Sequence, residues 1–350
     1  MHLSELGWNP RLEVGFQQYR SEGLVPARVA REDREHYLVY TEAGELVAQI
    51  SGKFRFAATG RADFPAVGDW VAIEGETIHA VLPRASKFSR KVAGVKTEEQ
   101  IVAANIDTLF IVCGLDGDFN PRRVERYLAP AWDSGATPVI VLNKADVCDD
   151  VAALIAEVEL IAAGIAVHPV SALDAEVDAL RPYCVLGNTV ALIGSSGVGK
   201  STLINALLGE DRQNTGDVSE HQDRGRHTTT QRELIVLPTG GLLIDNPGMR
   251  ELQLWSDKTG LDETFADITQ FAALCRFRDC RHEAEPGCAV QAALLDGTLD
   301  GERYRSYLKL KRELLYLARK QDQRIRAAEH ARWKSIARQN RARTKINKKL

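Results

Sequence analysis

One glycine-rich segment limits the folds open to this chain more than any other part of the sequence. Residues 194–201 read Gly194-Ser195-Ser196-Gly197-Val198-Gly199-Lys200-Ser201 and match the phosphate-binding loop pattern GxxxxGK(S/T) at every fixed position. The segment lies between an apolar strand pattern over Val190–Ile193 and a helix pattern over Thr202–Leu208, which is the context that such a loop requires. The sequence therefore predicts an α/β domain with a nucleotide phosphate site.

The residue types in this loop predict how the phosphates are held. Glycines let backbone amides converge on phosphate oxygens, and the helix that begins near Thr202 adds favourable partial charge at its N-terminus. We expect Lys200 to reach the β and γ phosphates and the Ser201 hydroxyl to ligate Mg²⁺. The whole loop, together with Thr202, is therefore assigned to nucleotide binding.

Three further polar loops directly follow strand patterns, and they predict which nucleotide binds. Asn143-Lys144-Ala145-Asp146 and Ser171-Ala172 are expected to face the base. A buried Asp146 carboxylate can accept the two N–H donors of guanine, whereas adenine has no such donor pair and would leave it unpaired. In the third loop, Asp245-Asn246-Pro247-Gly248, we expect Asp245 and Gly248 to contact the γ-phosphate and Asp245 to bind Mg²⁺.

The order of these loops is unusual. In most GTPases the phosphate loop comes first, whereas here Asp146 and Ser171 precede Gly194. This is the order of a circular permutation, which a compact domain tolerates because its termini tend to lie close together. Around the loops, apolar strands alternate with helix patterns over residues 108–244, which predicts a mostly parallel sheet with helices on both faces.

A different pattern precedes this α/β region. Five short strand patterns between residues 27 and 81 predict a small β-barrel. Within it, the basic residues Lys53, Arg55 and Arg61 lie among Phe54 and Phe56. That mixture suits RNA, because cations neutralise the backbone and aromatic rings stack on bases. The alternative is that both phenylalanines simply fill the barrel.

Charge is distributed unevenly along the chain. The net charge is only −3, yet residues 319–350 contain twelve lysines and arginines against two acids. Such a basic tail on an acidic body predicts a polyanionic partner, in the first place nucleic acid, although a solvated helix end is the other explanation. The sequence has no apolar run long enough to span a membrane and no export signal, so we expect a cytoplasmic protein with no membrane partner.

Near the C-terminus, four metal-binding side chains lie within fourteen residues. Cys275, Cys280, His282 and Cys288 offer three thiolates and one imidazole. Sets of this composition favour tetrahedral Zn²⁺. Because the spacing lacks a CxxC pair, buried or redox-active cysteines remain the alternative.

The loop order and the flanking elements together resemble the RsgA/YjeQ family of circularly permuted GTPases of small-subunit ribosome biogenesis. The most specific segments are Ala104-Asn105-Ile106-Asp107, Gly225-Arg226-His227-Thr228-Thr229-Thr230 and Asp245-Asn246-Pro247-Gly248-Met249-Arg250. The family more often has threonine where Asn246 stands. The resemblance covers nearly the whole chain. It implies hydrolysis of GTP to GDP and phosphate in late maturation of the small (30S) ribosomal subunit, with rRNA binding, stimulation by the subunit and one Zn²⁺ on the cysteine–histidine set.

The resulting prediction is an α/β protein with a circularly permuted P-loop GTPase domain, an N-terminal OB-type β-barrel and a C-terminal zinc-binding helical domain. A monomer is expected, since nothing in the sequence requires a second copy. The expected boundaries are 1–24 for an N-terminal extension, 25–90 for the RNA-binding barrel, 91–255 for the GTPase, 256–300 for the zinc segment and 301–350 for a basic helical extension.

The residues that perform hydrolysis are the least constrained by the sequence. The position after Gly248, where GTPases commonly carry a water-orienting glutamine, is Met249, which predicts slow turnover without the ribosome. In the polar stretch 211–232, expected to be the nucleotide-sensing switch, one of Thr228, Thr229 and Thr230 is predicted to complete the Mg²⁺ shell, and Thr229 is favoured. His227 is the predicted substitute for the glutamine, acting with Lys200; a solvent-facing histidine is the alternative.

Two rival functions follow from the same motifs. The first is a P-loop ATPase or kinase, against which Asn143 and Asp146 argue. The second is a non-catalytic RNA chaperone that holds GTP only as a structural ligand, and Met249 leaves room for it.

Overall fold

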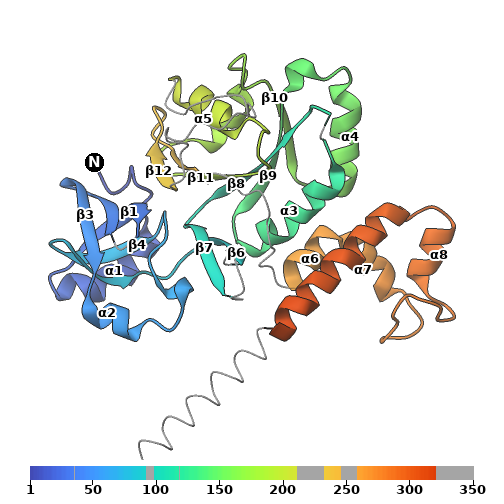
Figure 1. The fold of residues 1–350 in the computed structure, drawn as a ribbon, viewed down its shortest axis with the longest axis horizontal. Helices are drawn as coiled ribbons and strands as arrows, with labels where there is room; N and C mark the ends of the chain where they lie inside the picture. The colour runs from blue at the N-terminus through green and yellow to red at the C-terminus, as the bar shows by residue number, and fades with distance from the viewer. Residues whose placement is uncertain (35, 92–97, 118, 211–231, 246–257, 321–350) are drawn as a thin grey trace, which may run out of the picture.

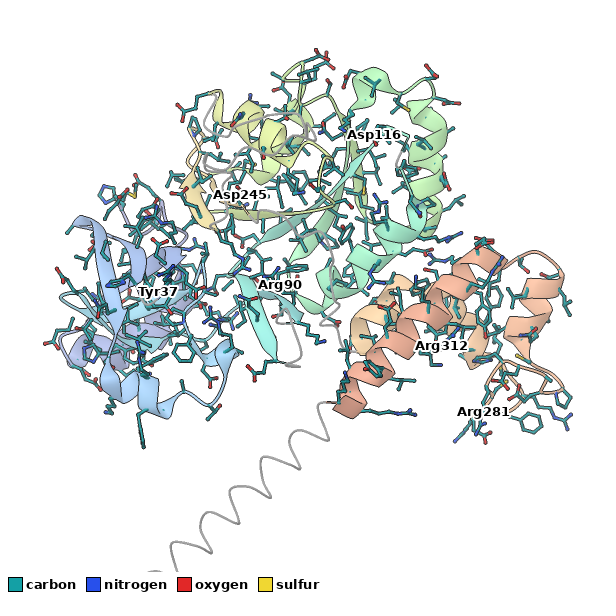
Figure 2. The ribbon with its side chains drawn as sticks, in the orientation of Figure 1. Tyr37, Arg90, Asp116, Asp245, Arg281 and Arg312 are labelled. Atoms are coloured by element: carbon teal, nitrogen blue, oxygen red, sulfur yellow. The ribbon has the colours of Figure 1, made fainter. Side chains whose placement is uncertain are left out.

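The computed structural model describes residues 1–350 except 35, 92–97, 118, 211–231, 246–257 and 321–350. Figure 1 shows three parts in a row: a blue barrel, a central green-to-yellow α/β body and an orange helical domain. Figure 2 labels Tyr37 in the barrel and Arg281 at the outer end of the helical domain, at opposite ends of the molecule. In the described part of the chain, no helix has both the length and the apolar character needed to cross a bilayer.

The predicted barrel is confirmed. Its strands are β1 (Val25–Asp33), β2 (His36–Thr41), β3 (Gly44–Ile50), β4 (Trp70–Glu74) and β5 (Thr77–Val81). They pair in the order β1-β2-β3-β5-β4, and β4 pairs back with β1, so the barrel closes. The β3–β5 pair is parallel, as in the OB fold. Alternate small and branched side chains such as Val29, Val39 and Ile78 fill the interior.

A short helix, α2 (Gly52–Ala57), connects β3 to β4 and carries the aromatic–basic mixture. Ser51 caps it by accepting the backbone N–H of Phe54 at 3.1 Å. Phe54 is half-buried against Phe64, but the Phe56 side chain is 93% exposed. The alternative in which both phenylalanines fill the barrel is therefore wrong, because α2 lies outside the barrel wall and turns Phe56 to solvent.

The N-terminal segment packs on the barrel. Helix α1 (Pro10–Ser21) begins at an Asn9 cap, and it buries Phe16 completely. The Trp8 ring meets the Trp70 ring edge-on at 4.7 Å, so this segment shares a core with β4.

The α/β body contains six strands whose order is β10-β9-β8-β11-β13-β12. Their bounds are β8 (Thr108–Gly114), β9 (Thr137–Asn143), β10 (Ala166–Val170), β11 (Thr189–Ile193), β12 (Glu233–Val236) and β13 (Leu242–Asp245). All neighbouring pairs are parallel except β12–β13, as the prediction of a mostly parallel sheet required. Strand β12 is antiparallel because it forms a hairpin with β13, and it also pairs with β1 through Arg31 and Glu233. Barrel and body thus share one continuous eleven-stranded sheet.

Helices cover both faces of this sheet, as predicted. On one face, α3 (Pro121–Asp133) and α4 (Val151–Ile161) pack through residues such as Leu128 and Val158. On the other, α5 (Lys200–Leu208) and the 3₁₀ helix η3 (Asp178–Tyr183) pack through Leu203 and Leu180. A separate two-stranded ribbon, β6 (Lys87–Lys91) with β7 (Glu99–Ala104), lies beside α3.

A buried arginine fastens the barrel to the body. Arg28 of β1 is 1% exposed and lies under the Trp70 ring. Its guanidinium donates to acceptors from separate parts of the chain: the carbonyl oxygens of Leu6, Gly68 and Asn105 and the Thr189 hydroxyl. Burial lowers the pKa of Arg28 to about 10, although the carboxylates of Asp107 and Asp69 act in the opposite direction.

The C-terminal domain is helical and has its own core. It contains α6 (Lys258–Thr264), α7 (Ala266–Ala273), α8 (Ala289–Leu295) and a helix over 301–320. These pack around Phe265, Ile268, Val290 and Tyr307. The predicted helical pattern after about residue 301 is confirmed as far as 320, and the remaining basic tail lies outside the described residues.

Candidate functional site

The predicted phosphate loop lies where the sequence placed it, between the end of β11 and the start of α5. Gly194 has a φ of 153°, and a Cβ there would lie 2.3 Å from the carbonyl oxygen of Val112. Gly199 has a φ of 87°, and a Cβ there would lie 2.3 Å from Nδ2 of Asn143. Both positions require glycine, because the loop passes directly over the ends of β8 and β9.

Lys200 folds back over this loop. Its ammonium donates to the carbonyl oxygens of Gly194 at 2.9 Å and Ser195 at 2.6 Å. Burial lowers the pKa of Lys200 to about 8, and the buried carboxylate of Asp245 opposes that shift. The first turn of α5, which includes Ser201 and Thr202, directs its backbone N–H groups toward the same loop. A cation and converging amides are the groups that bind a polyphosphate.

Asn143 joins the phosphate loop to both predicted base loops. It lies at the end of β9 and is 2% exposed. Its Nδ2 donates to the carbonyl oxygen of Val198 at 2.8 Å, and its Oδ1 accepts the N–H of Ala172 at 3.0 Å. Asn143 therefore links the phosphate loop to the Ser171–Ala172 loop, a contact that the sequence alone did not indicate.

The base-side residues also come together. The Ser171 hydroxyl lies 2.9 Å from Oδ1 of Asp146 and 2.7 Å from Oδ2 of Asp174. Lys144 has a left-handed backbone, and its ammonium lies 2.5 Å from Oδ2 of Asp116. The expectation of a buried Asp146 was wrong: the 3₁₀ turn η2 (Ala145–Val147) places its carboxylate at the surface beyond the sheet edge.

Parallel pairing explains why these distant segments meet. Strands β8, β9, β10, β11 and β13 all end at one edge of the sheet, so the loops that follow them converge there. In Figure 2, Asp116 and Asp245 mark this edge of the sheet. They lie in the upper part of the α/β body as drawn, away from the C-terminal domain that carries Arg312. Three predicted residues, His227, Thr229 and Gly248, lie outside the described residues.

Three further residues at this edge of the sheet were not predicted from the sequence. Asp116 follows a buried strand, as the predicted residues do, so the same rule could have found it. Asp174 lies three residues after Ser171, a spacing at which an aspartate can accept a hydrogen bond from the serine hydroxyl. Tyr127 of α3, whose hydroxyl lies 3.2 Å from Oγ of Ser195, has no local signal because only the tertiary fold brings it there.

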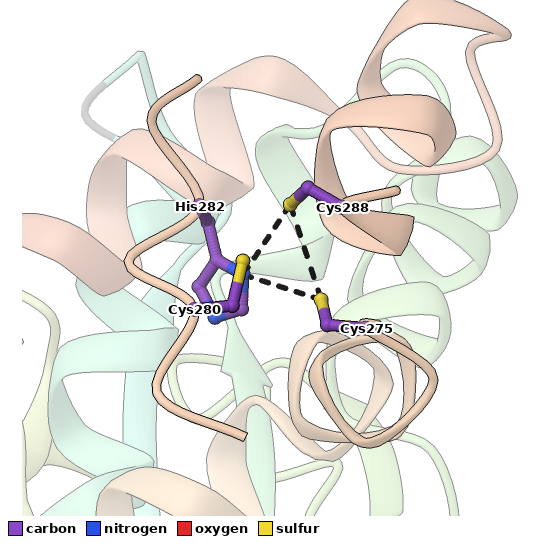
Figure 3. Close-up of side chains that lie close together, drawn as sticks. All are labelled: Cys275, Cys280, His282 and Cys288. Atoms are coloured by element: carbon purple, nitrogen blue, oxygen red, sulfur yellow. Dashed lines mark hydrogen bonds between the residues drawn. The ribbon is translucent and has the colours of Figure 1, made fainter. Parts of the chain in front are cut away.

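The four metal-binding side chains of the C-terminal domain form one cluster, drawn in Figure 3. One ligand atom from each lies within 4.8 Å of all the others. Nδ1 of His282 is 3.5 Å from Sγ of both Cys275 and Cys288, and those two sulfurs are 3.9 Å apart. Tetrahedral Zn–S bonds of ~2.3 Å would separate two sulfurs by ~3.8 Å. The donor set therefore fits a small tetrahedral metal ion.

The environment of His282 suits the same role. Burial lowers its pKa, with Lys311 acting in the same direction and Glu285 opposing them, which favours the neutral imidazole that binds metals. The carbonyl oxygen of His282 accepts Nε2 of Gln291 at 2.5 Å, which fixes the turn that presents the ring.

Base-side loops that precede a phosphate loop, with an aspartate loop after it, define a circularly permuted P-loop GTPase. The RsgA GTPase family model matches residues 81–255. The chain is 49% identical to the small ribosomal subunit biogenesis GTPase RsgA of Opitutus terrae, with 99% of each chain covered, and 44% identical to that of Syntrophotalea carbinolica, with 97% of each covered. It belongs to the RsgA GTPase family.

Solved structures agree with the fold. YjeQ from Thermotoga maritima superposes with a TM-score of 0.61 at 26% identity, covering 83% of this chain and 99% of that one. YloQ, described as a circularly permuted GTPase, superposes with a TM-score of 0.57 at 23% identity, covering 83% of this chain and 95% of that one.

Proposed function

We propose that this protein is a GTPase of small ribosomal subunit maturation, which binds rRNA and is stimulated by the subunit. The observation that carries the proposal is the near-complete alignment, at 44–49% identity, with proteins named for that process. A ribosomal partner implies action in the cytoplasm. The proposal requires neither a second copy of the chain nor a membrane.

The proposed nucleotide site comprises the converged loops. Asp146 and Ser171 face the guanine, with Asn143, Lys144 and Ala172 behind them. The phosphate loop, Lys200 and the amides of α5 hold the phosphates, and Ser201, Asp245 and Thr229 ligate Mg²⁺, the ion that neutralises the developing charge in P-loop GTPases. A competition titration tests the base: displacement of labelled GTP by ATP at equal concentration would favour the rival ATPase or kinase.

Within this site, we propose that Lys200 stabilises the charge on the transferred phosphoryl oxygens and that His227 orients the attacking water. Support comes from Met249, a side chain unable to hydrogen-bond water usefully at the position of the common glutamine. His227→Ala should lose subunit-stimulated turnover and keep wild-type GTP affinity. Full stimulated turnover in that variant would reject the role.

Two surfaces are proposed to bind rRNA. On the barrel, α2 presents Lys53 and Arg55 beside the exposed Phe56 ring, a combination that neutralises phosphates and stacks on bases. The second is the basic segment 319–350. Deleting 319–350 should weaken binding to the small subunit and stimulation by it without changing GTP affinity; loss of GTP affinity would mean that the tail belongs to the GTPase core.

We propose Zn²⁺ as the metal of the Cys275–Cys280–His282–Cys288 cluster, because three thiolates and one imidazole favour this ion. Elemental analysis of protein purified without added metal tests it. One zinc per chain, lost in Cys288→Ser, is expected, whereas iron or no metal would reject the assignment.

The decisive experiment is GTP turnover by the purified protein alone, with small subunits and with large subunits. Slow turnover alone and strong stimulation only by small subunits are expected. Equal turnover in all three conditions would reject ribosomal stimulation. A complete lack of single-turnover hydrolysis on small subunits would favour the RNA chaperone that uses GTP as a structural ligand.

A further inference from the structure

A hydrogen bond connects helix α3 to the phosphate loop. The Tyr127 hydroxyl lies 3.2 Å from Oγ of Ser195, and the tyrosine is 4% exposed, with its ring packed in the sheet core beside Leu128. The backbone oxygen of the same Ser195 accepts the Lys200 ammonium at 2.6 Å. Tyr127 therefore holds the loop residue that in turn holds Lys200.

The two residues before Tyr127 bind the C-terminal domain. The Glu125 carboxylate is fully buried and accepts Nη1 of Arg303 at 2.9 Å, while Arg122 of its own helix reaches the same oxygen at 2.6 Å. Next to it, Arg126 pairs with Glu313 at 2.9 Å. One turn of α3 thus faces the phosphate loop on one side and the helix over 301–320 on the other.

The attachment extends along the helix. Arg303 also binds both carboxylate oxygens of Asp267, at 2.8 and 2.9 Å, and lies over the Phe265 ring. At the far end of α3, the Gly260 N–H donates to Oδ1 of Asp133 at 2.7 Å, and a Cβ at Gly260 would lie 2.1 Å from the carbonyl oxygen of Ala129. Because buried charges are costly to separate, α3 must follow any displacement of this domain.

We propose that Tyr127 is a positioning residue for the phosphate loop and that, through α3, it couples the loop to the C-terminal domain. The contact that the tyrosine makes in this structure is with Ser195 of the loop. Its ring is fixed by core packing, so a shift of α3 changes the hydroxyl contact with Ser195 and, through the Ser195 carbonyl, the position of Lys200. Helix α3 then carries the docking state of the C-terminal domain to the nucleotide site.

Binding of a fluorescent GTP analogue to the full chain tests the first link. Tyr127→Phe should raise the dissociation constant about twofold to tenfold, the range for one lost hydrogen bond, and should lower the Tm by no more than Tyr40→Phe does. Ser195→Ala should have the same effect, and the double variant should be no worse than either. Tyr40→Phe is the matched control: it removes a buried hydroxyl contact between the barrel and the carbonyl oxygen of Leu234 in β12, away from the phosphate loop, and should bind GTP normally.

Wild-type affinity for Tyr127→Phe, or single effects that multiply in the double variant, would overturn the positioning role. Because the inference rests on the proposed GTP site, the wild type is titrated first. Failure of the wild type to bind rejects the site itself, whereas binding by the wild type with an unaffected Tyr127→Phe rejects only the inference.

Arg303→Lys tests the second link, since a lysine cannot bridge Glu125 and Asp267 as the guanidinium fork does. It should weaken GTP binding in the wild-type background and have little further effect when combined with Tyr127→Phe. If Arg303→Lys raised the dissociation constant for GTP by the same factor in the wild-type and Tyr127→Phe backgrounds, the coupling would be overturned. If Arg303→Lys unfolds the domain, Glu313→Gln, which removes only a half-exposed ion pair, is tested in the same cycle with the same criteria.

Discussion

Asn143→Asp is the most informative substitution at the proposed GTP site, because it changes one hydrogen-bonding atom and almost no volume. The carboxylate keeps an acceptor for the Ala172 N–H but replaces the amide donor to Val198. Two oxygens would then face one another at the 2.8 Å now occupied by a hydrogen bond. The substitution thus breaks the link to the phosphate loop and leaves the link to the base loop intact.

The magnitude follows from burial. Leaving the Val198 carbonyl oxygen unpaired costs ~1–3 kcal/mol. The position is 2% exposed, so the introduced carboxylate also places a desolvated negative charge next to that oxygen. We expect a loss of ~2–4 kcal/mol in the free energy of unfolding and at least a roughly tenfold rise in the dissociation constant for GTP.

Urea unfolding and titration with a fluorescent GTP analogue measure the two effects. Asn120→Asp is the matched control, because the Asn120 side chain accepts the Arg122 N–H as a helix cap, a task that aspartate performs equally well. That variant should be neutral in both assays. Wild-type GTP affinity in Asn143→Asp would refute the reasoning that this side chain holds the loops together.

Three further predictions concern other parts of the molecule. Lys200 has a pKa of about 8 and is charged below it, so GTP affinity should fall as the pH rises through 8, up to about tenfold per pH unit. The Lys200→Met variant should instead bind GTP weakly at every pH. Calorimetric titration from about one pH unit below that pKa to one unit above it measures both effects. Gly194→Ala should abolish nucleotide binding, since its Cβ would meet a backbone oxygen at 2.3 Å; a folded variant with wild-type affinity would contradict this. Arg28→Met should lower the free energy of unfolding by ~3–5 kcal/mol in urea, because buried acceptors from distant parts of the chain lose their donor.

Features governed by local pattern could be predicted from the sequence. The phosphate loop, the strands before each polar loop and the five barrel strands each have a signal within a few residues, and parallel pairing then places the loop ends together. The Cys275–Cys288 set was recognisable because its four ligands are close in sequence. The proposed contacts of these loops with a nucleotide remain predictions.

Features that depend on distant segments could not be predicted. The pairing of Arg31 with Glu233, which joins barrel and body, has no pattern of its own. The orientation of Phe56 and the exposure of Asp146 depend on how a short helical turn leaves a sheet, which residue type does not determine. Nothing in the local sequence distinguishes Tyr127 from its neighbours on α3, and only the fold shows that its hydroxyl contacts Ser195.

The buried Arg28 has a consequence for the order in which the protein is completed during synthesis. Its side-chain acceptor on β11, Thr189, lies 161 residues further along the chain. At ~5–20 residues per second, the ribosome needs on the order of ten to thirty seconds to make that stretch. For most of this interval all five barrel strands have been made, but the Arg28 guanidinium still lacks its last acceptor, Thr189. The barrel therefore has to remain folded without this hydrogen bond until the ribosome has made β11, the strand that leads into the phosphate loop. Only then can the buried Arg28 bind Thr189, its last acceptor.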